Sequence, residues 1–240
     1  IMANGLSQDL KNPLSSIKML LERSDDKGKR FSLSQFKHIL GFEVERLDKI
    51  IEDFSYYSNI GNLNYSDVHI NKLIADVHKI IQENYSSYNF RIEKILSPAP
   101  KIKCDSNKIK QVLLNLLLNA IESLPETGGA ISIQTFNKNE TELQVSITDN
   151  GRGILPDDKD KLFIPFYSKN PDSIGLGLAI SQKIIQAHQG TIQYESNNTH
   201  KTTFSFSLPI IHKSDIEKAI PTNLLHVTST HAKLDKVSTT

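Results

Sequence analysis

Residues 143–154 read Leu-Gln-Val-Ser-Ile-Thr-Asp-Asn-Gly-Arg-Gly-Ile, an alternating run that ends in an aspartate and a glycine-rich turn. The alternation predicts a β-strand in which Leu143, Val145 and Ile147 share one face. Asp149 has the same parity, and a carboxylate at the apolar end of a strand is costly without a partner. Two interpretations remain open: an aspartate that caps a loop, or an acceptor for an adenine amino group in an apolar pocket.

Two asparagines interrupt a leucine-rich segment upstream, Gln111-Val-Leu-Leu-Asn115-Leu-Leu-Leu-Asn119-Ala120. The segment predicts an apolar helix over residues 106–124, and a spacing of four places the two amides on one helix face. They could form a polar edge that caps a loop. We favour a second interpretation, because amide oxygens ligate Mg²⁺ beside phosphate oxygens.

Two further elements follow the glycine-rich turn. Gly175-Leu-Gly177-Leu-Ala opens a predicted helix, where glycines let the backbone approach an anion and the helix N-terminus favours phosphate. A flexible helix start is the alternative. Residues 162–169, Leu-Phe-Ile-Pro-Phe-Tyr-Ser-Lys, place three aromatic side chains and Lys169 between the two glycine pairs. They predict either a mobile cover over a nucleotide or an apolar loop packed on the core.

The patterns along the whole chain predict an α+β protein. Helices are expected at residues 3–23, 32–58, 70–85, 106–124 and 175–188, and strands at 90–95, 130–136, 142–149, 190–195 and 202–208. This order is typical of an α/β sandwich with helices on one face of a mostly antiparallel sheet. We divide the chain into a helical hairpin (1–60), a linker (61–66), an α/β domain (67–210) and a polar tail or linker (211–240).

Each helix of the hairpin carries an apolar stripe. In the second helix the stripe has the alternating spacing of four and three that coiled coils use, and its members are Leu40, Val44, Leu47, Ile51 and Phe54. A lone hairpin cannot bury both stripes well, so we expect a homodimer whose four helices form a bundle. The alternative is that both helices pack on the α/β domain.

Residues 6–14 of the first helix read Leu-Ser-Gln-Asp-Leu-Lys-Asn-Pro-Leu. Gln8 faces away from the apolar stripe, because it lies about 200° around the helix from Leu10. Pro13 cannot donate to the carbonyl group of Asp9, which loosens the helix at that point. The stretch resembles the phosphoacceptor box of sensor histidine kinases, Ser-His-(Glu/Asp)-Leu-(Arg/Lys)-(Thr/Asn)-Pro-Leu, except that glutamine occupies the histidine position.

The four elements described first resemble, in chain order, the asparagine, first glycine, phenylalanine and second glycine boxes of the same family's catalytic domain. The resemblance covers about residues 4–209. It implies the GHKL or Bergerat-type fold, which gyrase and MutL ATPases share, and it implies ATP and Mg²⁺ as cofactors. By this resemblance Asp149 recognises adenine, Gly151 and Gly153 shape the pocket, Lys169, Gly175 and Gly177 contact the nucleotide, and Asn115 and Asn119 hold Mg²⁺ and phosphates, with Asn119 as the metal ligand.

The family reaction transfers the γ-phosphoryl group of ATP to residue 8, and then to an aspartate on the receiver domain of a response regulator. By the resemblance Asp9 would be the general base, and Asp9 with Asn12 would position water for dephosphorylating that partner. The amide nitrogen of Gln8 has no nucleophilic lone pair, because the lone pair is delocalised into the carbonyl group. We therefore expect no autophosphorylation by this chain.

Two explanations of Gln8 are open. It is an introduced substitution in an ordinary kinase, or it is natural and leaves a phosphatase-only pseudokinase or a catalytically silent dimeric ATP-binding module. Another ATPase of the same fold is a further alternative, against which the hairpin argues. Two departures from the family pattern affect the phosphate side of the pocket: Ser173 stands where a glycine is frequent, and Lys201 precedes two threonines where Gly-x-Gly-Thr is usual.

Composition limits the remaining possibilities. The formal net charge is +1, so no overall field favours nucleic acid or a membrane surface. The single cysteine, Cys104, excludes an internal disulfide and is expected in the core, while the scattered histidines are expected mostly at the surface. No apolar run approaches the roughly 20 residues that span a bilayer, and a single cysteine fits a reducing compartment. The resemblance to sensor histidine kinases implies a cytoplasmic fragment without direct membrane contact. Because the chain begins almost inside a motif, we expect a longer parent protein whose inner-membrane anchor would lie upstream.

Overall fold

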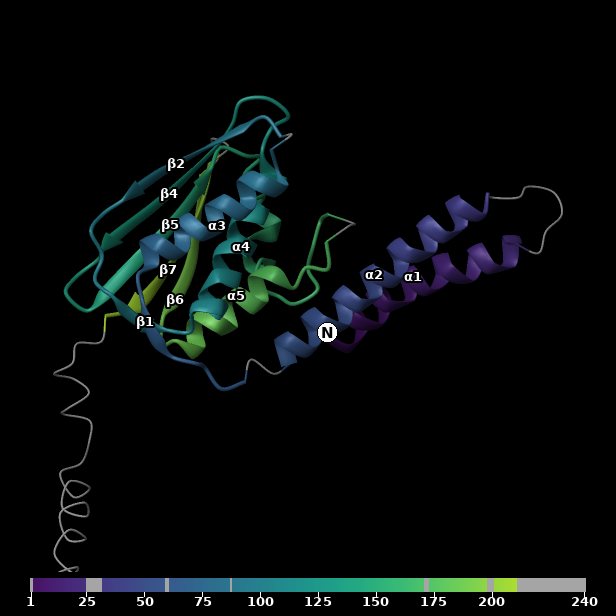
Figure 1. Ribbon diagram of the computed structural model, residues 1–240, viewed down its shortest axis with the longest axis horizontal. Helices are drawn as coiled ribbons and strands as arrows, with labels where there is room; N and C mark the ends of the chain where they lie inside the picture. Colours follow the sequence, from purple (N-terminus) through teal and green to yellow (C-terminus); the bar gives the residue numbers. More distant parts are fainter. Residues whose placement is uncertain are drawn as a thin grey trace, which may run out of the picture.

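The computed structural model describes residues 2–24, 32–58, 61–86, 88–170, 173–197 and 201–210. Two long helices, α1 (Met2–Ser24) and α2 (Leu33–Ser58), run antiparallel and extend from one side of an α/β domain (Figure 1). The predicted hairpin is therefore confirmed. The expected breaker at residues 25–28 and the tail at 211–240 lie outside the described residues.

The two helices of the hairpin bury only part of their apolar surface against each other. Leu20 of α1 and Ile50 of α2 are buried, and Pro13 lies inside α1 without ending it. Val44 and Ile51 of the predicted α2 stripe remain 44% and 54% exposed. The hairpin alone thus leaves an apolar strip on α2 in contact with water.

The α/β domain consists of one five-stranded sheet, a two-stranded ribbon and three α-helices. Its elements are β1 (Ser66–Val68), α3 (Ile70–Asn84), β2 (Phe90–Leu96), β3 (Ile102–Cys104), α4 (Ser106–Ser123), β4 (Gly129–Asn137), β5 (Glu142–Asp149), the 3-10 helix η1 (Pro156–Lys161), α5 (Gly177–Ala187), β6 (Thr191–Asn197) and β7 (Lys201–Pro209). The sheet order is β2-β4-β5-β7-β6, in which only the β2–β4 pair is parallel. Helices α3, α4 and α5 cover one face of the sheet (Figure 1), so the predicted fold class is confirmed.

The period of two along the strands decides which face the helices cover. In β5 and β7, Val145 pairs with Phe206 and Ile147 pairs with Phe204, and all four side chains are buried. The intervening residues, Ser146 and Ser205, face the other side of the sheet. Asp149 ends β5 on the helix-covered face, opposite Thr202 of β7 and Ile131 of β4. The core therefore extends up to this carboxylate.

A cap fixes the start of α4, the helix that carries the two predicted asparagines. Oδ1 of Asp105 accepts hydrogen bonds from the backbone N–H groups of Asn107 and Lys108, both at 3.1 Å. Asn64, which precedes β1, donates its N–H to Oδ2 of the same carboxylate at 2.9 Å. Burial alone would raise the pKa of Asp105, but these backbone hydrogen bonds outweigh it and hold the pKa below the ordinary value.

Two expectations about single residues have different outcomes. Cys104 is fully buried, as expected, and burial raises the pKa of its thiol to about 12. His188, which is 2% exposed, is an exception to the expectation that most histidines lie at the surface. Its Nδ1 donates to the carbonyl oxygen of Ile184 at 2.8 Å, and its Nε2 accepts from the N–H of Asp105 at 3.0 Å. His188 thus ties the end of α5 to the start of α4.

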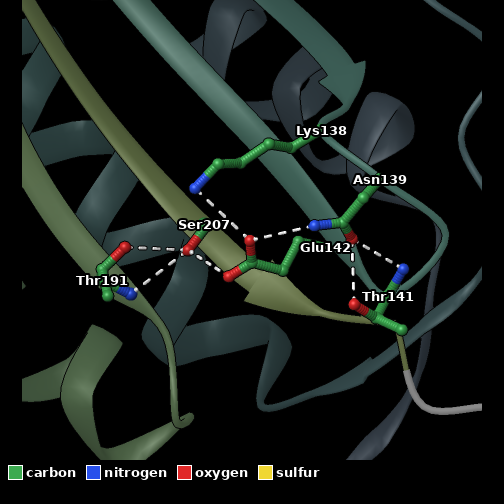
Figure 2. A network of polar contacts seen from close by, with 6 residues as sticks. All are labelled: Lys138, Asn139, Thr141, Glu142, Thr191 and Ser207. Atoms are coloured by element: carbon green, nitrogen blue, oxygen red, sulfur yellow. Dashed lines mark hydrogen bonds and ion pairs between the residues drawn. The ribbon is translucent and has the colours of Figure 1, made fainter.

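A network of polar side chains occupies the start of β5, at the end of that strand remote from Asp149 (Figure 2). Glu142 forms an ion pair with Lys138 at 3.4 Å and accepts a hydrogen bond from Ser207 at 3.4 Å. Ser207 also contacts Thr191, with 2.9 Å between the two hydroxyl oxygens. The network joins β5, β6 and β7, and every group in it has a protein partner.

Within the described residues, no helix is long and apolar enough to cross a lipid bilayer.

Candidate functional site

A cavity of about 440 Å³ opens between α4, the C-terminal end of β5, the segment from η1 to α5, and one face of α2. The segment between β5 and α5 projects from the domain toward the hairpin (Figure 1). Seven of the residues that the sequence predicts for nucleotide and metal binding line the cavity: Asn115, Asn119, Asp149, Gly153, Lys169, Gly175 and Gly177. The fold thus brings together residues from four separate sequence elements.

Asp149 forms the inner end of the cavity and is 3% exposed. Its Oδ1 accepts hydrogen bonds from the Ser123 hydroxyl at 3.0 Å and from the Gly151 N–H at 2.8 Å. Burial raises the pKa of this carboxyl group above its ordinary value, although both hydrogen bonds act in the opposite direction. Because both donors use Oδ1, Oδ2 can accept a hydrogen bond from a ligand.

Gly151 is required by close packing behind Asp149. A Cβ at this position would lie 2.2 Å from the Ser123 hydroxyl oxygen and 2.7 Å from Oδ1 of Asp149. Gly153, two residues on, has a φ of 74°, which favours glycine. The two glycines therefore let the turn after β5 fold tightly against the end of α4.

Asn119 carries an unpaired donor. Among the described residues, three buried side-chain polar atoms lack a hydrogen-bond partner, and Nδ2 of Asn119 is the one that belongs to a residue lining the cavity. A buried donor without a partner costs about 1–3 kcal/mol. Asn115 differs, because its Nδ2 donates to the carbonyl oxygen of Gly177 at 3.0 Å and contacts the Ser181 hydroxyl at 3.3 Å. Asn119 is thus free to bind a ligand, whereas the Asn115 nitrogen joins α4 to α5.

The second glycine pair lies where the cavity meets the first turn of α5. Gly175 has a φ of 70°, and a Cβ there would lie 2.6 Å from the backbone of Tyr167. Gly177 is the first residue of α5, and a Cβ there would make only an ordinary contact with Asn115. A helix N-terminus with little side-chain cover is suited to bind an anion such as phosphate.

Asp158 on η1 was not predicted from the sequence, and it anchors the aromatic cover segment. The Tyr167 hydroxyl donates to Oδ1 of Asp158 at 2.6 Å, and Lys169 forms an ion pair with Oδ2. The Lys169 ammonium group, followed by the Tyr167 hydroxyl, lowers the pKa of Asp158. Lys169 lines the cavity as predicted, but its charge is paired with this carboxylate in the structure.

Three residues of α2 also line the cavity and were missed by the sequence analysis: Arg46, Lys49 and Asp53. Charged residues at these positions of a coiled-coil helix are typical of a solvent-exposed face. No signal in the sequence places that face against a domain that begins after Gly61. The contact between this face of α2 and the cavity is visible only in the folded structure, where the chain after α2 brings the two together.

The phosphoacceptor box lies on α1. Gln8 and Asp9 are within the helical span Met2–Ser24, but their side chains lie outside the described residues. Asn12 is exposed. The roles expected for these three residues therefore stay predictions.

The fold and cavity define a nucleotide-binding α/β domain behind a helical hairpin, and comparisons with known proteins agree with this class. Residues 1–63 match the His Kinase A (phospho-acceptor) domain, and residues 104–212 match the family of histidine kinase-, DNA gyrase B- and HSP90-like ATPases. The chain thus carries a phosphoacceptor domain and an ATPase domain of these families, and its relatives include sensor histidine kinases.

Curated relatives extend over most of the chain. Sensor histidine kinase ZraS of Escherichia coli (strain K12) is 31% identical over 214 residues, which are 87% of this chain and 45% of ZraS. Sensory histidine kinase/phosphatase NtrB of Vibrio alginolyticus is 31% identical over 222 residues, 88% of this chain and 62% of NtrB. The chain thus spans about half the length of ZraS.

Solved structures agree in fold. Acinetobacter baumannii histidine kinase AdeS has a TM-score of 0.69 and 28% identity, with 85% of this chain and 98% of that chain covered. Histidine kinase ThkA in complex with the response regulator protein TrrA has a TM-score of 0.72 and 28% identity, with 88% of this chain and 61% of that chain covered.

Proposed function

We propose that this chain is the ATP-binding and dimerising core of a sensor histidine kinase whose autophosphorylation is blocked by Gln8. The proposal rests on the incomplete hydrogen bonding of two residues that line the same cavity, Asp149 and Asn119. One is a buried carboxylate with an oxygen available to a ligand, and the other is a buried amide donor without a partner. An adenine nucleotide would pair with both groups, because its amino group can donate to Asp149 and its phosphate oxygens can accept from Asn119.

The residues of the cavity would divide the nucleotide between them. Asp149 would accept from the adenine amino group, and Gly151 would keep the carboxylate in place through its N–H. Asn119 would contribute its amide to a phosphate oxygen or, through its oxygen, to Mg²⁺. No cluster of three or more histidine, cysteine, aspartate or glutamate side chains suited to a metal ion exists among the described residues. Phosphate oxygens would therefore complete the coordination of Mg²⁺.

ATP would supply the γ-phosphoryl group, and residue 8 would be its acceptor when it is histidine. Gln8 keeps the size and polarity of the acceptor but has no nucleophilic nitrogen. Asp9 would act as general base, and a receiver-domain aspartate of a response regulator would be the next acceptor. The kinase ThkA forms a complex with a response regulator, which supports this class of partner. We propose that the reaction takes place in the cytoplasm, where the chain would meet ATP and such a partner.

A phosphatase is the second candidate function. Asp9 and Asn12 keep the spacing that would position water, and Asn12 is exposed where a partner could reach it. The relative NtrB carries both kinase and phosphatase in its name. Dephosphorylation of a receiver domain does not require a nucleophile at position 8, so it would survive the glutamine.

Nucleotide titration tests the ATP site. Calorimetry with Mg-ADP should show binding to the unmodified chain, and Asp149→Asn should weaken it by about 10- to 100-fold through loss of a charge-assisted hydrogen bond. Glu142→Gln is the matched control, because it removes a carboxylate from the opposite end of the same strand. Equal affinity for Asp149→Asn and the unmodified chain would contradict the proposed site.

The proposed homodimer rests on the apolar strip that the hairpin leaves uncovered. Val44 and Ile51 lie on one side of α2, and both are more than 40% exposed. A second copy would cover them in a four-helix bundle. Light scattering should give a dimer at micromolar concentration and a monomer for Val44→Asp/Ile51→Asp. A monomeric unmodified chain would contradict the bundle, and Lys18→Gln serves as the control on the exposed face.

A further inference from the structure

One face of α2 forms a wall of the cavity, although it belongs to the hairpin and not to the ATP-binding domain. Arg46, Lys49 and Asp53 have spacings of three and four, so they lie on one side of the helix. Two of the three are cations. None belongs to the boxes that the family resemblance assigns to the nucleotide.

Contacts on the C-terminal side of Asp53 hold this part of α2 against the domain. Lys183 of α5 donates to the carbonyl oxygen of Tyr57 at 2.9 Å, and its Nζ lies 3.8 Å from the centroid of the Tyr57 ring. Lys108 of α4 lies 3.8 Å from the centroid of the Tyr56 ring. Cation–π pairs of this kind add to the attraction between α2 and the domain. The α2 face is thus fixed beside the cavity by two neighbouring aromatic residues.

Asp53 is half-buried at this wall. Burial raises the pKa of its carboxyl group, although Lys49, one turn away, acts to lower it. Glu52 adds a smaller contribution in the same direction as burial. Arg46 is also half-buried, whereas Lys49 is exposed. An electrostatic contact with Arg46 is therefore less screened than it would be on an open helix surface.

The charges of the cavity show why the α2 cations matter. Two cations on the ATP-binding domain, Arg152 and Lys169, line it together with three carboxylates, Glu122, Asp149 and Asp158. Lys169 is already paired with Asp158. The domain's own wall is thus negative overall, which is unfavourable for a triphosphate. The α2 face contributes two cations against one carboxylate and so brings positive charge to the site.

The register of the hairpin places these cations at the level of the phosphoacceptor position. Residue 8 lies sixteen residues before Ser24, the end of α1, and Lys49 lies sixteen residues after Leu33, the start of α2. With a rise of about 1.5 Å per residue, both positions lie about 24 Å from the loop end of the hairpin. A phosphoryl group that is transferred to residue 8 would therefore lie at about the same height along the hairpin as Lys49.

From these observations we infer that Arg46 and Lys49 are positioning residues that hold the γ-phosphoryl group of ATP at the level of residue 8. The inference rests on the proposed ATP site, and it makes the hairpin part of the nucleotide-binding surface. Guanidinium and ammonium groups neutralise the charge of a transferring phosphoryl group and fix its direction. Asp53 offers Lys49 a competing carboxylate when the γ-phosphoryl group is absent. Arg46 and Lys49 should therefore favour ATP over ADP.

The test compares equilibrium affinities for Mg-ATP and Mg-ADP, which the unmodified chain can bind without transferring phosphate to Gln8. The double variant Arg46→Gln/Lys49→Gln should bind Mg-ATP about tenfold or more weakly, while its affinity for Mg-ADP should change less than about twofold. The matched control Lys18→Gln/Lys37→Gln makes the same charge change elsewhere on the hairpin and should alter neither affinity. Lys49→Arg keeps the charge and should retain most of the preference for ATP.

Equal weakening of both nucleotides would overturn the inference, because the two cations would then support the cavity in general and not the γ-phosphoryl group. Unchanged affinity for both nucleotides would overturn it as well. If the unmodified chain binds neither nucleotide, the proposed ATP site itself is wrong. That result is distinguishable from the other two, in which the unmodified chain binds both nucleotides.

Discussion

The two ends of strand β5 each carry a carboxylate, and the surroundings of the two carboxylates differ in charge and in burial. Glu142, at the start of the strand, faces away from the helices and is held by Lys138, Asn139 and Ser207 (Figure 2). Asp149, at the other end, is on the helix-covered face and is 3% exposed. No ion pair among the described residues includes Asp149. Ser123 and Gly151 both donate to its Oδ1.

The difference separates a structural network from a binding site. At the Glu142 end a cation offsets the negative charge, and the protein itself satisfies the polar groups. At the Asp149 end the carboxylate is buried without a cation, and the neighbouring amide donor of Asn119 is unpaired. Such an arrangement costs stability in the absence of a ligand. We therefore attribute it to a ligand that forms hydrogen bonds with both groups.

The largest effect is expected from glycines that pack against each end. In Gly151→Ala the new Cβ would meet Ser123 at 2.2 Å, and in Gly190→Ala it would meet the carbonyl oxygen of Ser207 at 2.0 Å. Each substitution should lower the free energy of unfolding by about 1–3 kcal/mol through overpacking. Thermal unfolding measures this loss, and calorimetry should show that only Gly151→Ala also loses Mg-ADP affinity. Comparable loss of affinity in folded Gly190→Ala would remove the distinction between the two ends.

A smaller effect of opposite sign is expected from Asp149→Asn without nucleotide. Because burial raises the pKa of Asp149 above the ordinary 3.8, the folded state binds its proton more tightly than the unfolded state does. The carboxylate therefore costs stability as the pH rises from 3.8 through the raised pKa, and the cost is complete at neutral pH. Asparagine cannot ionise, so the variant should have a Tm at pH 7 that is higher by about 2–4 °C, or about 1 kcal/mol.

The pH dependence gives this prediction its control. The advantage of Asp149→Asn should shrink as the pH is lowered toward 3.8, because the parent then becomes neutral at the same position. Glu142→Gln should show no such gain, since it removes the partner of Lys138. An Asp149→Asn protein that is less stable than the parent at every pH would show that the two hydrogen bonds to the charged group outweigh its burial.

Much of this comparison could be predicted from the sequence. The period of two placed Asp149 on the apolar face, and a spacing of four placed Asn115 and Asn119 together; the structure brings all three to one cavity. The elements of ten or more residues were predicted to within two residues at each end, because their periodicity extends over several turns. The three-residue strands β1 and β3 are too short to show an alternation, and they were missed.

The partners of the site residues were not predictable in the same way. Asp158 is recognised only when the chain folds back so that it meets Tyr167 and Lys169, nine and eleven residues later. The cavity wall formed by Arg46 and Lys49 depends on how the domain docks on α2, and that contact has no local pattern. His188 is buried because it joins two helices that are distant in sequence. Each of these features depends on tertiary contacts.

We propose that the ATP site is intact and that only the acceptor at position 8 is missing. Labelled ATP and Mg²⁺ should be incubated with the unmodified chain and with Gln8→His, and acid-labile, base-stable label should then be sought. We expect label on Gln8→His alone, because imidazole supplies the nucleophile that the amide lacks, and no label on Gln8→His/Asp149→Asn. Label on the unmodified chain, or a Gln8→His protein that binds ATP but stays unlabelled, would contradict it.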